Sequence, residues 1–351
     1  MPGTGHDFQN ISYLCHGGSQ AAGCVRFCLM SIHVVLVTAN PSEPELALLE
    51  PLKAANTIVA GDSPEVFDDA VLKADVILHW SGSRDLLRSL FLRAPNLQWV
   101  HSKSAGLDGV LFPELIESSI PLTNGTGVFS ASLGEFALGA VLYFAKDFRR
   151  LIRNQMAGRW EEFDVQVVAG QTLGIVGYGD IGREVASRAR AMGMRILALK
   201  RHVHSQTADP LIEQFFTPAQ RLQMIAECDY VVISAPLTAE TRGLVGEQEI
   251  AAMKPDGVVI NIGRGPVLQE RPLIKALEMG LIRGAALDVF EEEPLRAGHP
   301  FYSLENVLLS PHSADHTFDW KHRAMLLFLE QFERFQRGQK LQNLVKKHLG
   351  Y

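Results

Sequence analysis

The sequence predicts an α/β protein of two domains, each built around a parallel β-sheet. The length of 351 residues suits two domains of ordinary size. After Met30, short apolar segments alternate with amphipathic ones, which is typical of strand–helix–strand units. Hydrophobic residues make up 47% of the chain and charged residues 21%, so there are enough apolar side chains for a core.

Charge and hydropathy argue against two classes of partner. The net charge is −6 and no long basic stripe occurs, so we expect no nucleic acid as a partner. No run of about 18 uncharged apolar residues is present, so we expect no membrane span.

The first 29 residues are predicted to form a disordered extension, because they are rich in Gly, Ser, Gln and Asn and show no periodicity. Met30 could begin the functional chain; alternatively, the extension is a transit peptide, although Arg26 is its single basic residue. We expect a cytoplasmic location, with organelle targeting left open. Three of the four cysteines lie in this extension: Cys15, Cys24 and Cys28. Their number and positions do not suggest a disulfide framework, and their spacing matches no common zinc site, so we expect no bound metal.

The first predicted domain begins with a buried strand at 31–38, "SIHVVLVT". Helical segments are expected near 43–53 and 84–92. The other strands of this domain are expected at 56–60, 74–80 and 97–102, and the block ends near 120–124. A long helix should then run from Ser130 to Phe148. Its small residues would allow close packing on a neighbour: Ala131, Gly134, Ala137, Gly139 and Ala140.

The second predicted domain contains six strands, the size of one dinucleotide-binding sheet. The strands are expected at 172–177, 195–199, 230–235, 257–262, 284–289 and 306–312. A last helix, 320–337, lies beyond this sheet. A lone amphipathic helix needs a partner surface, so we expect it to fold back on the first domain.

Residues 177–182 fit the pattern Gly-x-Gly-x-x-Gly between a predicted strand and a predicted helix. The first glycine permits a tight turn, the second lets a pyrophosphate approach the backbone, and the third lets helix and strand pack. The helix start then offers free N–H groups to phosphates. The predicted cofactor contacts are Gly177, Tyr178, Gly179, Asp180, Ile181 and Gly182.

The end of the next strand distinguishes NADP from NAD. NAD binding usually requires an acidic residue about 20 positions further on, to hold the ribose 2′-hydroxyl. This chain has Lys200 and Arg201 there and no carboxylate. Two cations suit a 2′-phosphate, so we predict NADP, with NAD possible; the alternative is a solvated strand edge.

Polar residues follow three apolar strands at the ends where open α/β sheets bind ligands. These residues are Arg264, Asp288 with Glu293, and His312. Each also has a plainer interpretation: Arg264 as a surface cation, Glu293 as part of a solvated run of glutamates, and His312 as one of two candidates with His316.

The chain resembles the D-isomer-specific 2-hydroxyacid dehydrogenases, which include glyoxylate/hydroxypyruvate reductases. The similarity is densest in "GQTLGIVGYGDIGREVA", "APLTAETRGLVGEQEIAAMKPDGVVINIGRG" and "LDVFEEEPL", which follow the family order and spacing. The resemblance implies a Rossmann dinucleotide-binding domain at 130–312. That domain would be inserted in a flavodoxin-like substrate-binding (catalytic) domain made of 30–129 and 313–351.

The resemblance also implies roles. Arg264 would hold the substrate carboxylate and polarise the 2-oxo group, and His312 would transfer the proton. Glu293 would hold the imidazole and favour its protonated form. Asp288 resembles the residue that binds the nicotinamide carboxamide. Further cofactor contacts would be Ala235, Pro236, Thr241, Ile262 and Gly263, together with Arg264 and His312.

The first domain would supply the other side of the site. "HSKSAGLDGV" resembles the family loop whose backbone N–H groups meet the carboxylate, here at Ala105 and Gly106. Trp80, Ser81 and Gly82 are weaker pocket candidates. The chain reads "PHSADHT" where the family usually has glycine or Ala-Gly after the proton donor, so His316 and Trp320 would shape an unusual pocket.

We therefore expect an oxidoreductase that uses NADPH to reduce a small 2-oxoacid, such as glyoxylate or hydroxypyruvate, to a D-2-hydroxyacid. The alternatives are an NAD-linked phosphoglycerate-type or formate-type dehydrogenase, and a corepressor-like protein of the same fold that binds NAD(P). The family implies a homodimer, with the region 130–148 as its interface.

Overall fold

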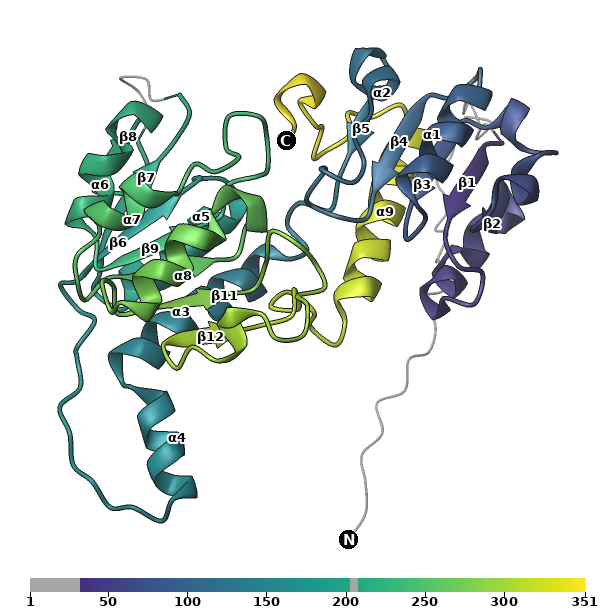
Figure 1. The fold of residues 1–351 in the computed structure, drawn as a ribbon. Helices are drawn as coiled ribbons and strands as arrows, with labels where there is room; N and C mark the ends of the chain where they lie inside the picture. Colours follow the sequence, from purple (N-terminus) through teal and green to yellow (C-terminus); the bar gives the residue numbers. More distant parts are fainter. Residues whose placement is uncertain (1–31, 203–207) are drawn as a thin grey trace, which may run out of the picture. The chain divides into compact units, whose positions relative to one another are not determined.

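Two separate parallel sheets form the framework of the computed structural model, which describes residues 32–202 and 208–351 (Figure 1). One sheet has five strands in the order β2-β1-β3-β4-β5, and the other has seven in the order β12-β11-β10-β9-β6-β7-β8. The predicted class, two α/β domains with parallel sheets, is confirmed. The predictions made for residues 1–31 lie outside the described residues.

The strands of the first sheet are β1 (Val34–Thr38), β2 (Thr57–Gly61), β3 (Val76–His79), β4 (Trp99–Ser102) and β5 (Leu122–Thr123). β3 and β4 are buried along their whole length, as expected for strands covered on both faces. The helices are α1 (Arg84–Arg93) and α2 (Pro113–Glu117). The segment expected near 43–53 forms a 3₁₀ helix, η1 (Pro44–Ala54), in which Pro51 has no N–H to donate.

The second sheet contains one strand more than the sequence predicted. Its strands are β6 (Thr172–Val176), β7 (Arg195–Leu199), β8 (Gln214–Phe216), β9 (Tyr230–Ile233), β10 (Val258–Asn261), β11 (Gly284–Leu287) and β12 (Val307–Leu309). β8 was missed because it is a three-residue edge strand, too short to show a periodic pattern. The helices around this sheet are α5 (Asp180–Ala191), α6 (Arg221–Glu227), α7 (Glu247–Ala252) and α8 (Glu270–Glu278).

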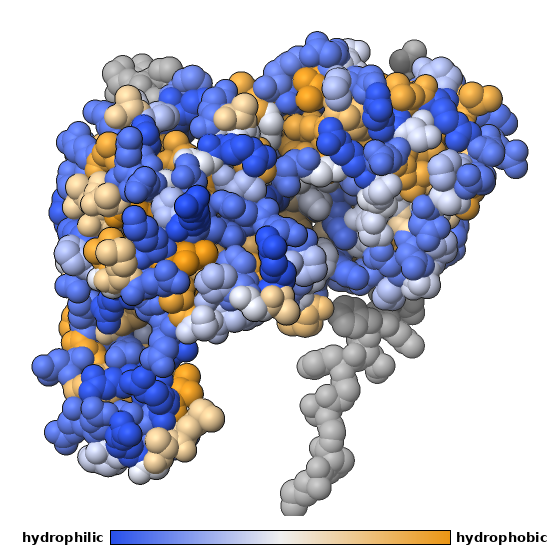
Figure 2. Space-filling view, viewed as in Figure 1, coloured by the Kyte–Doolittle hydropathy of each residue, from blue (hydrophilic) through white to orange (hydrophobic). Residues whose placement is uncertain are grey.

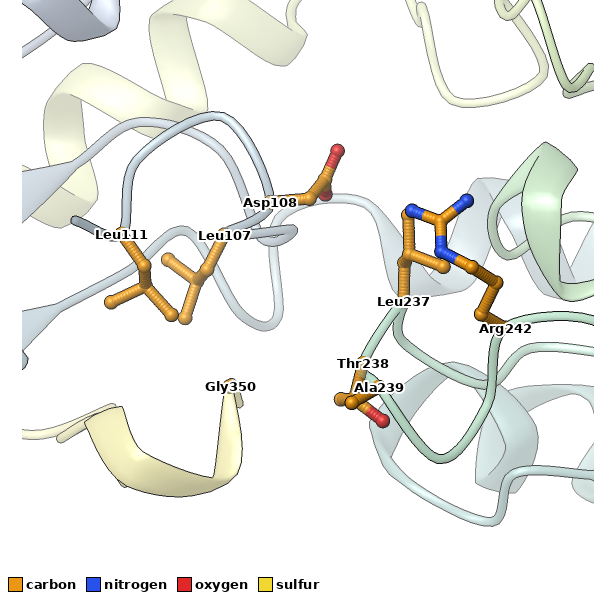
Figure 3. A pocket seen from close by; sticks show the side chains of 8 residues that line it. All are labelled: Leu107, Asp108, Leu111, Leu237, Thr238, Ala239, Arg242 and Gly350. Carbon is orange, nitrogen blue, oxygen red and sulfur yellow. The ribbon is translucent and has the colours of Figure 1, made fainter. Parts of the chain in front are cut away.

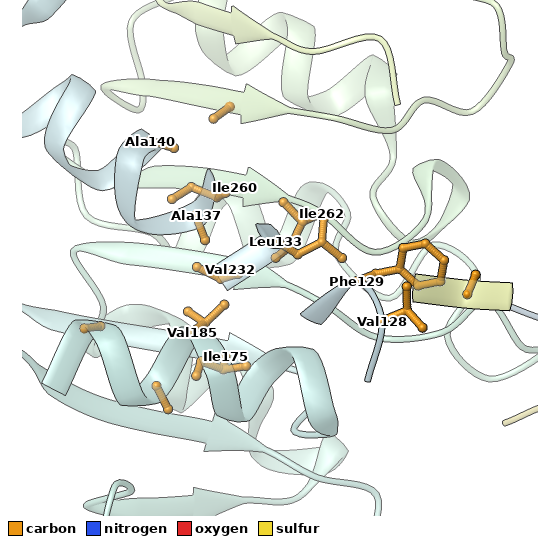
Figure 4. Close-up of a cluster of buried hydrophobic side chains, with 14 of the residues drawn as sticks. Val128, Phe129, Leu133, Ala137, Ala140, Ile175, Val185, Val232, Ile260 and Ile262 are labelled. Carbon is orange, nitrogen blue, oxygen red and sulfur yellow. The ribbon is translucent and has the colours of Figure 1, made fainter. Parts of the chain in front are cut away.

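The predicted helix from Ser130 to Phe148 corresponds to α3 (Ser130–Ala145), and a second helix that was not predicted, α4 (Phe148–Met156), follows it. Asp147 separates them: its φ of 48° is left-handed, and its side chain accepts a hydrogen bond from Arg150 N. α3 packs into the core beside α5 and the second sheet (Figure 4). Among its small residues, Gly134, Ala137 and Ala140 are buried, but Gly139 is exposed.

The last helix, α9 (Trp320–Gln336), packs on the first sheet (Figure 1). The Phe328 ring stacks on Trp99 of β4 with centroids 5.5 Å apart, and Phe332 is fully buried. This apolar face supplies the partner surface that an amphipathic helix needs. Among residues 32–202 and 208–351, no helix combines the length and apolar character required to cross a membrane.

Candidate active site

The glycine loop between β6 and α5 has the backbone that a bound pyrophosphate requires. Gly177 has a φ of +98°, and a Cβ there would lie 2.5 Å from Ala235 Cα. A Cβ on Gly182 would lie 2.8 Å from Gly177 O, so only glycine allows this packing of helix on strand. Gly179, just before α5, faces open space. The loop therefore has the open space and the free helix N–H groups that binding the phosphates of a dinucleotide requires.

The other side chains of this loop are held by neighbours. The hydroxyl of Tyr178 donates to Asp209 Oδ2 at 2.9 Å, and burial raises the pKa of Tyr178. Asp180 Oδ2 accepts a hydrogen bond from Ser130 Oγ, which ties the start of α5 to the start of α3. Ile181 packs against the core.

The residues after β9 and β10 close the same edge of the sheet. Ala235 and Ile262 are buried, and Gly263 N donates to Asn261 Oδ1 at 3.2 Å. Thr241 Oγ1 donates to Pro236 O at 2.6 Å and so braces the loop after β9. These five predicted positions thus lie on two loops at the carboxyl ends of adjacent strands.

Lys200 and Arg201 follow β7, the strand next to the glycine loop. Lys200 Nζ lies 5.9 Å from the centroid of the Phe215 ring. Arg201 Nη2 lies 3.0 Å from Glu240 Oε2, and its guanidinium stands over the Tyr351 ring at 5.3 Å. Both cations are therefore present at the strand end, with Arg201 paired to an exposed carboxylate.

Arg264 leaves β10 and contacts the loop after β4. Its Nε donates to Asp108 Oδ1 at 2.9 Å, and its Nη1 donates to Gly263 O at 2.7 Å. A Cβ on Gly106 would lie 1.4 Å from Arg264 Nη2, so a side chain here would displace the guanidinium from its present position. Burial acts to raise the pKa of Asp108, but the charge and hydrogen bond of Arg264 outweigh it and hold that pKa low.

His312 and Glu293 form a pair. Glu293 Oε2 lies 2.7 Å from His312 Nδ1, and Glu293 Oε1 accepts the backbone N–H of Phe290 at 2.9 Å. The other two glutamates of the run have different partners. The backbone N–H groups of Glu270 and Glu291 each donate to the other residue's carboxylate, and Arg296 donates to the carboxylate of Glu292. The imidazole remains 42% exposed, so Nε2 can reach a ligand.

Asp288 holds the backbone around His312. Its Oδ1 accepts the N–H groups of Ser313 and Ala314 at 2.9 and 3.0 Å, and its carbonyl oxygen accepts His312 N at 2.8 Å. These bonds keep His312 at a φ of 52°, which is unusual for a residue with a side chain. Asp288 is buried, and no hydrogen bond engages its Oδ2 among the described residues.

The first-sheet candidates divide into two groups. The N–H groups of Ala105 and Gly106 have no acceptor among the described residues, so they are available to a carboxylate. Trp80 is buried, with its Nε1 donating to Glu43, and a Cβ on Gly82 would meet Thr38. Ser81 Oγ donates to the same Glu43.

His316 is not part of the His312–Glu293 pair. Its ring stacks on Trp320, with centroids 5.0 Å apart, and its Nε2 lies 3.6 Å from Asp315. Burial raises the pKa of Asp315.

A cavity of about 370 Å³ lies beside Asp108 (Figure 3). Leu107 and Leu111 line one side, and Leu237 and Arg242 line the other. Arg264, Glu293 and His312 are not among its lining residues, so this cavity adjoins the candidate catalytic groups through Asp108 and does not contain them.

A model of the NAD-binding domain of D-isomer-specific 2-hydroxyacid dehydrogenases matches residues 138–314. This chain belongs to that family. The predicted resemblance is confirmed, and with it the assignment as an oxidoreductase that binds a nicotinamide dinucleotide.

Relatives of this dehydrogenase include a glyoxylate reductase of Thermococcus gammatolerans, 36% identical over 272 residues, or 74% of this chain and 79% of the relative. A D-3-phosphoglycerate dehydrogenase of Methanocaldococcus jannaschii is 29% identical over 89% of this chain, but the match spans only 59% of that longer protein. Among solved structures, an NADPH-dependent glyoxylate/hydroxypyruvate reductase of Sinorhizobium meliloti in complex with NADP and sulfate superposes with a TM-score of 0.77. It is 26% identical and covers 92% of this chain and 100% of that one.

Two contacts of this dehydrogenase were not foreseen from the sequence. Asp108, two residues after Gly106, pairs with Arg264, and a carboxylate so close to the predicted loop was the available signal. Lys103, at the start of the same loop, lies over two tryptophan rings, which no sequence pattern indicates. Within the described ranges, no group of three or more His, Cys, Asp and Glu residues is arranged to hold a metal.

Proposed function

We propose that this dehydrogenase uses NADPH to reduce a small 2-oxoacid of the glyoxylate or hydroxypyruvate kind to the D-2-hydroxyacid. The observation that carries the proposal is the His312–Glu293 pair, 2.7 Å apart, because a hydrogen-bonded imidazole with one exposed nitrogen is a suitable proton donor. The names of the Thermococcus and Sinorhizobium relatives support the same substrate class.

Each side chain then has a defined task. Arg264 uses the N–H groups not taken by Asp108 and Gly263 to hold the substrate carboxylate, aided by the N–H groups of Ala105 and Gly106. The same guanidinium stabilises negative charge that develops on the carbonyl oxygen. Glu293 engages Nδ1 of His312, which leaves Nε2 to give its proton to that oxygen. The bound nicotinamide supplies the hydride.

The dinucleotide is proposed to lie along the glycine loop, with Asp288 Oδ2 accepting a hydrogen bond from the N–H group of the nicotinamide carboxamide. The preference for NADP rests on Lys200 and Arg201, which replace the carboxylate that NAD enzymes use. Glu240 shares Arg201 in this structure, so a 2′-phosphate would have to replace that contact.

We also propose a homodimer, with an interface on α4 and not on α3. α3 uses its small face inside the chain, whereas α4 and the segment after it expose apolar side chains (Figure 2). Leu151 is 47%, Ile152 54%, Met156 84% and Trp160 93% exposed. Apolar patches of this kind mark contact surfaces.

The test is a panel of glyoxylate, hydroxypyruvate and 3-phosphohydroxypyruvate, assayed with NADPH and NADH, with the chirality of the product determined. We expect turnover of the first two substrates, faster with NADPH, and a D-product where C2 is chiral. Preference for the phosphorylated substrate with NADH would favour the phosphoglycerate-type alternative. Tight cofactor binding without turnover of any 2-oxoacid would favour a binding protein.

Light scattering of wild type and Met156→Asp tests the dimer.

A further inference from the structure

Lys103 lies on the loop that meets the proposed substrate-binding guanidinium. The residue directly follows β4, and its backbone N–H donates to His79 O at 3.0 Å, which joins the ends of β3 and β4. Three residues further along the loop, Gly106 packs against Arg264 Nη2. Three residues span at most about 11 Å. The backbone of Lys103 therefore lies within about 11 Å of the glycine that contacts Arg264.

The Lys103 ammonium group is fixed between two indole rings. Its Nζ lies 4.9 Å from the centroid of Trp80 and 5.1 Å from that of Trp320. Trp80 follows β3, whereas Trp320 begins α9 at the end of the loop that starts with His312. Aromatic faces attract a cation without cancelling its charge. The loop after β4 thus carries the Lys103 ammonium group, and the loop that starts with His312 ends at one of the two rings that hold it.

Two carboxylates act on the charge of Lys103, Glu43 and Glu45, and Glu43 is already engaged by other groups. Its Oε2 accepts Trp80 Nε1 at 2.6 Å and lies 3.8 Å from Lys321 Nζ, and its Oε1 accepts Ser81 Oγ. Lys103 forms no ion pair within the described part of the chain, although the charges of Glu43 and Glu45 act on it from a greater distance. Burial lowers the pKa of Lys103, so its environment does not fully compensate its charge.

We propose that Lys103 binds a second carboxylate of the substrate, so that 2-oxo dicarboxylates are preferred over monocarboxylates of equal length. The inference rests on the proposed function, because Arg264 must first hold the carboxylate next to the reacting carbonyl. A single lysine supplies one positive charge, which suits a carboxylate better than a phosphate dianion. A monocarboxylate would leave the Lys103 ammonium without an anion at ion-pair distance, and such a loss discriminates between substrates.

Matched pairs of substrates test this without any mutation. 2-Oxobutanoate is compared with 2-oxobutanedioate, and 2-oxopentanoate with 2-oxopentanedioate, since each pair differs only in a terminal methyl or carboxylate group. Reduction is followed by NADPH oxidation. In at least one pair we expect kcat/KM to be tenfold or more higher for the dicarboxylate, with the difference mainly in KM. The pair that shows the preference reports the distance between the two carboxylate sites.

Variants then assign the preference to Lys103. Lys103→Met should lower the dicarboxylate-to-monocarboxylate ratio of kcat/KM at least tenfold, and Lys103→Arg should restore part of it. Lys321→Met is the matched control, because it removes a lysine of the same cluster that already faces Glu43. We expect it to change the ratio by less than about threefold, which is about half of the 1.4 kcal/mol that a tenfold step represents.

The outcomes separate the two proposals. Turnover of glyoxylate with no dicarboxylate preference in either pair would overturn the role of Lys103 and leave the proposed function intact. An equal loss for both members of a pair in Lys103→Met would reduce Lys103 to a structural residue. Failure to reduce any 2-oxoacid would overturn the proposed function, and this inference with it.

Discussion

The carboxyl ends of the two sheets carry histidines in opposite environments. In the first sheet, His79 and His101 are buried and bonded to threonine hydroxyls, and burial lowers their pKa values to about 4 and about 3. After β12 of the second sheet, His312 is partly exposed and paired with Glu293. Position at the end of a strand therefore does not make a histidine reactive. The proposed role of His312 as proton donor depends instead on its exposed ring and its carboxylate partner.

Replacing the histidine on each sheet should give the largest contrast. His312→Asn should lower kcat at least about 1,000-fold, because the proton donor is lost. This loss corresponds to an increase of about 4 kcal/mol in the activation free energy. NADPH binding, followed by fluorescence titration, should persist. His79→Asn is the matched control and should retain kcat within about tenfold. Unchanged turnover in His312→Asn would remove that residue from the mechanism.

The next largest effect is expected on coenzyme preference, from the two cations that follow β7. The double variant Lys200→Asp, Arg201→Pro removes both cations and supplies a carboxylate for a ribose hydroxyl. The ratio of kcat/KM for NADPH to that for NADH should fall at least tenfold, about 1.4 kcal/mol. Glu240→Gln should shift the ratio slightly toward NADPH, because it frees Arg201. If wild type uses NADH as well as NADPH, the assignment of these cations is wrong.

The buried histidine of β4 should appear in stability rather than in turnover. The unfolded chain takes up a proton near pH 6.5, whereas folded His101 resists protonation down to about pH 3. The contribution of neutral His101 to the free energy of unfolding is therefore complete above about pH 6.5. It is lost as the pH falls toward 3, by at most about 1.4 kcal/mol per pH unit.

Urea unfolding at several pH values measures this loss. His101→Gln should flatten the pH dependence, whatever it does to the stability at pH 7. His348→Gln, at an exposed position, is the control. An unaltered slope in His101→Gln would show that other groups govern acid sensitivity.

The smallest expected effects concern the packing beneath the cofactor loop. A Cβ on Gly134 of α3 would lie 3.2 Å from the backbone of Glu184 in α5, whereas one on Gly139 would meet nothing within 4 Å. Gly134→Ala should destabilise the fold by about 1 kcal/mol through crowding, and Gly139→Ala should stabilise it by up to about 1 kcal/mol through helix propensity. Thermal unfolding compares the two variants; equal shifts would contradict this view of the α3–α5 contact.

The sequence predicted the elements whose pattern is local. The apolar runs located β6, β9 and β10, and the glycine spacing located the loop before α5, because these depend on residues close in sequence. The helix α4 was missed, because the expected helix ended at Phe148, where α4 begins after the left-handed Asp147. The Asp108–Arg264 and Lys103–tryptophan contacts were missed because they join residues far apart in the chain, which only the folded backbone brings together.

The left-handed backbone of His312 decides which replacements at this position can be interpreted. Asparagine visits that conformation readily, so His312→Asn removes the imidazole and spares the turn. Valine or isoleucine would resist the same φ, pull on the amides that Asp288 anchors, and combine a chemical loss with a shape change. Variant libraries at this codon should therefore be scored against Asn and Gly, not against alanine alone.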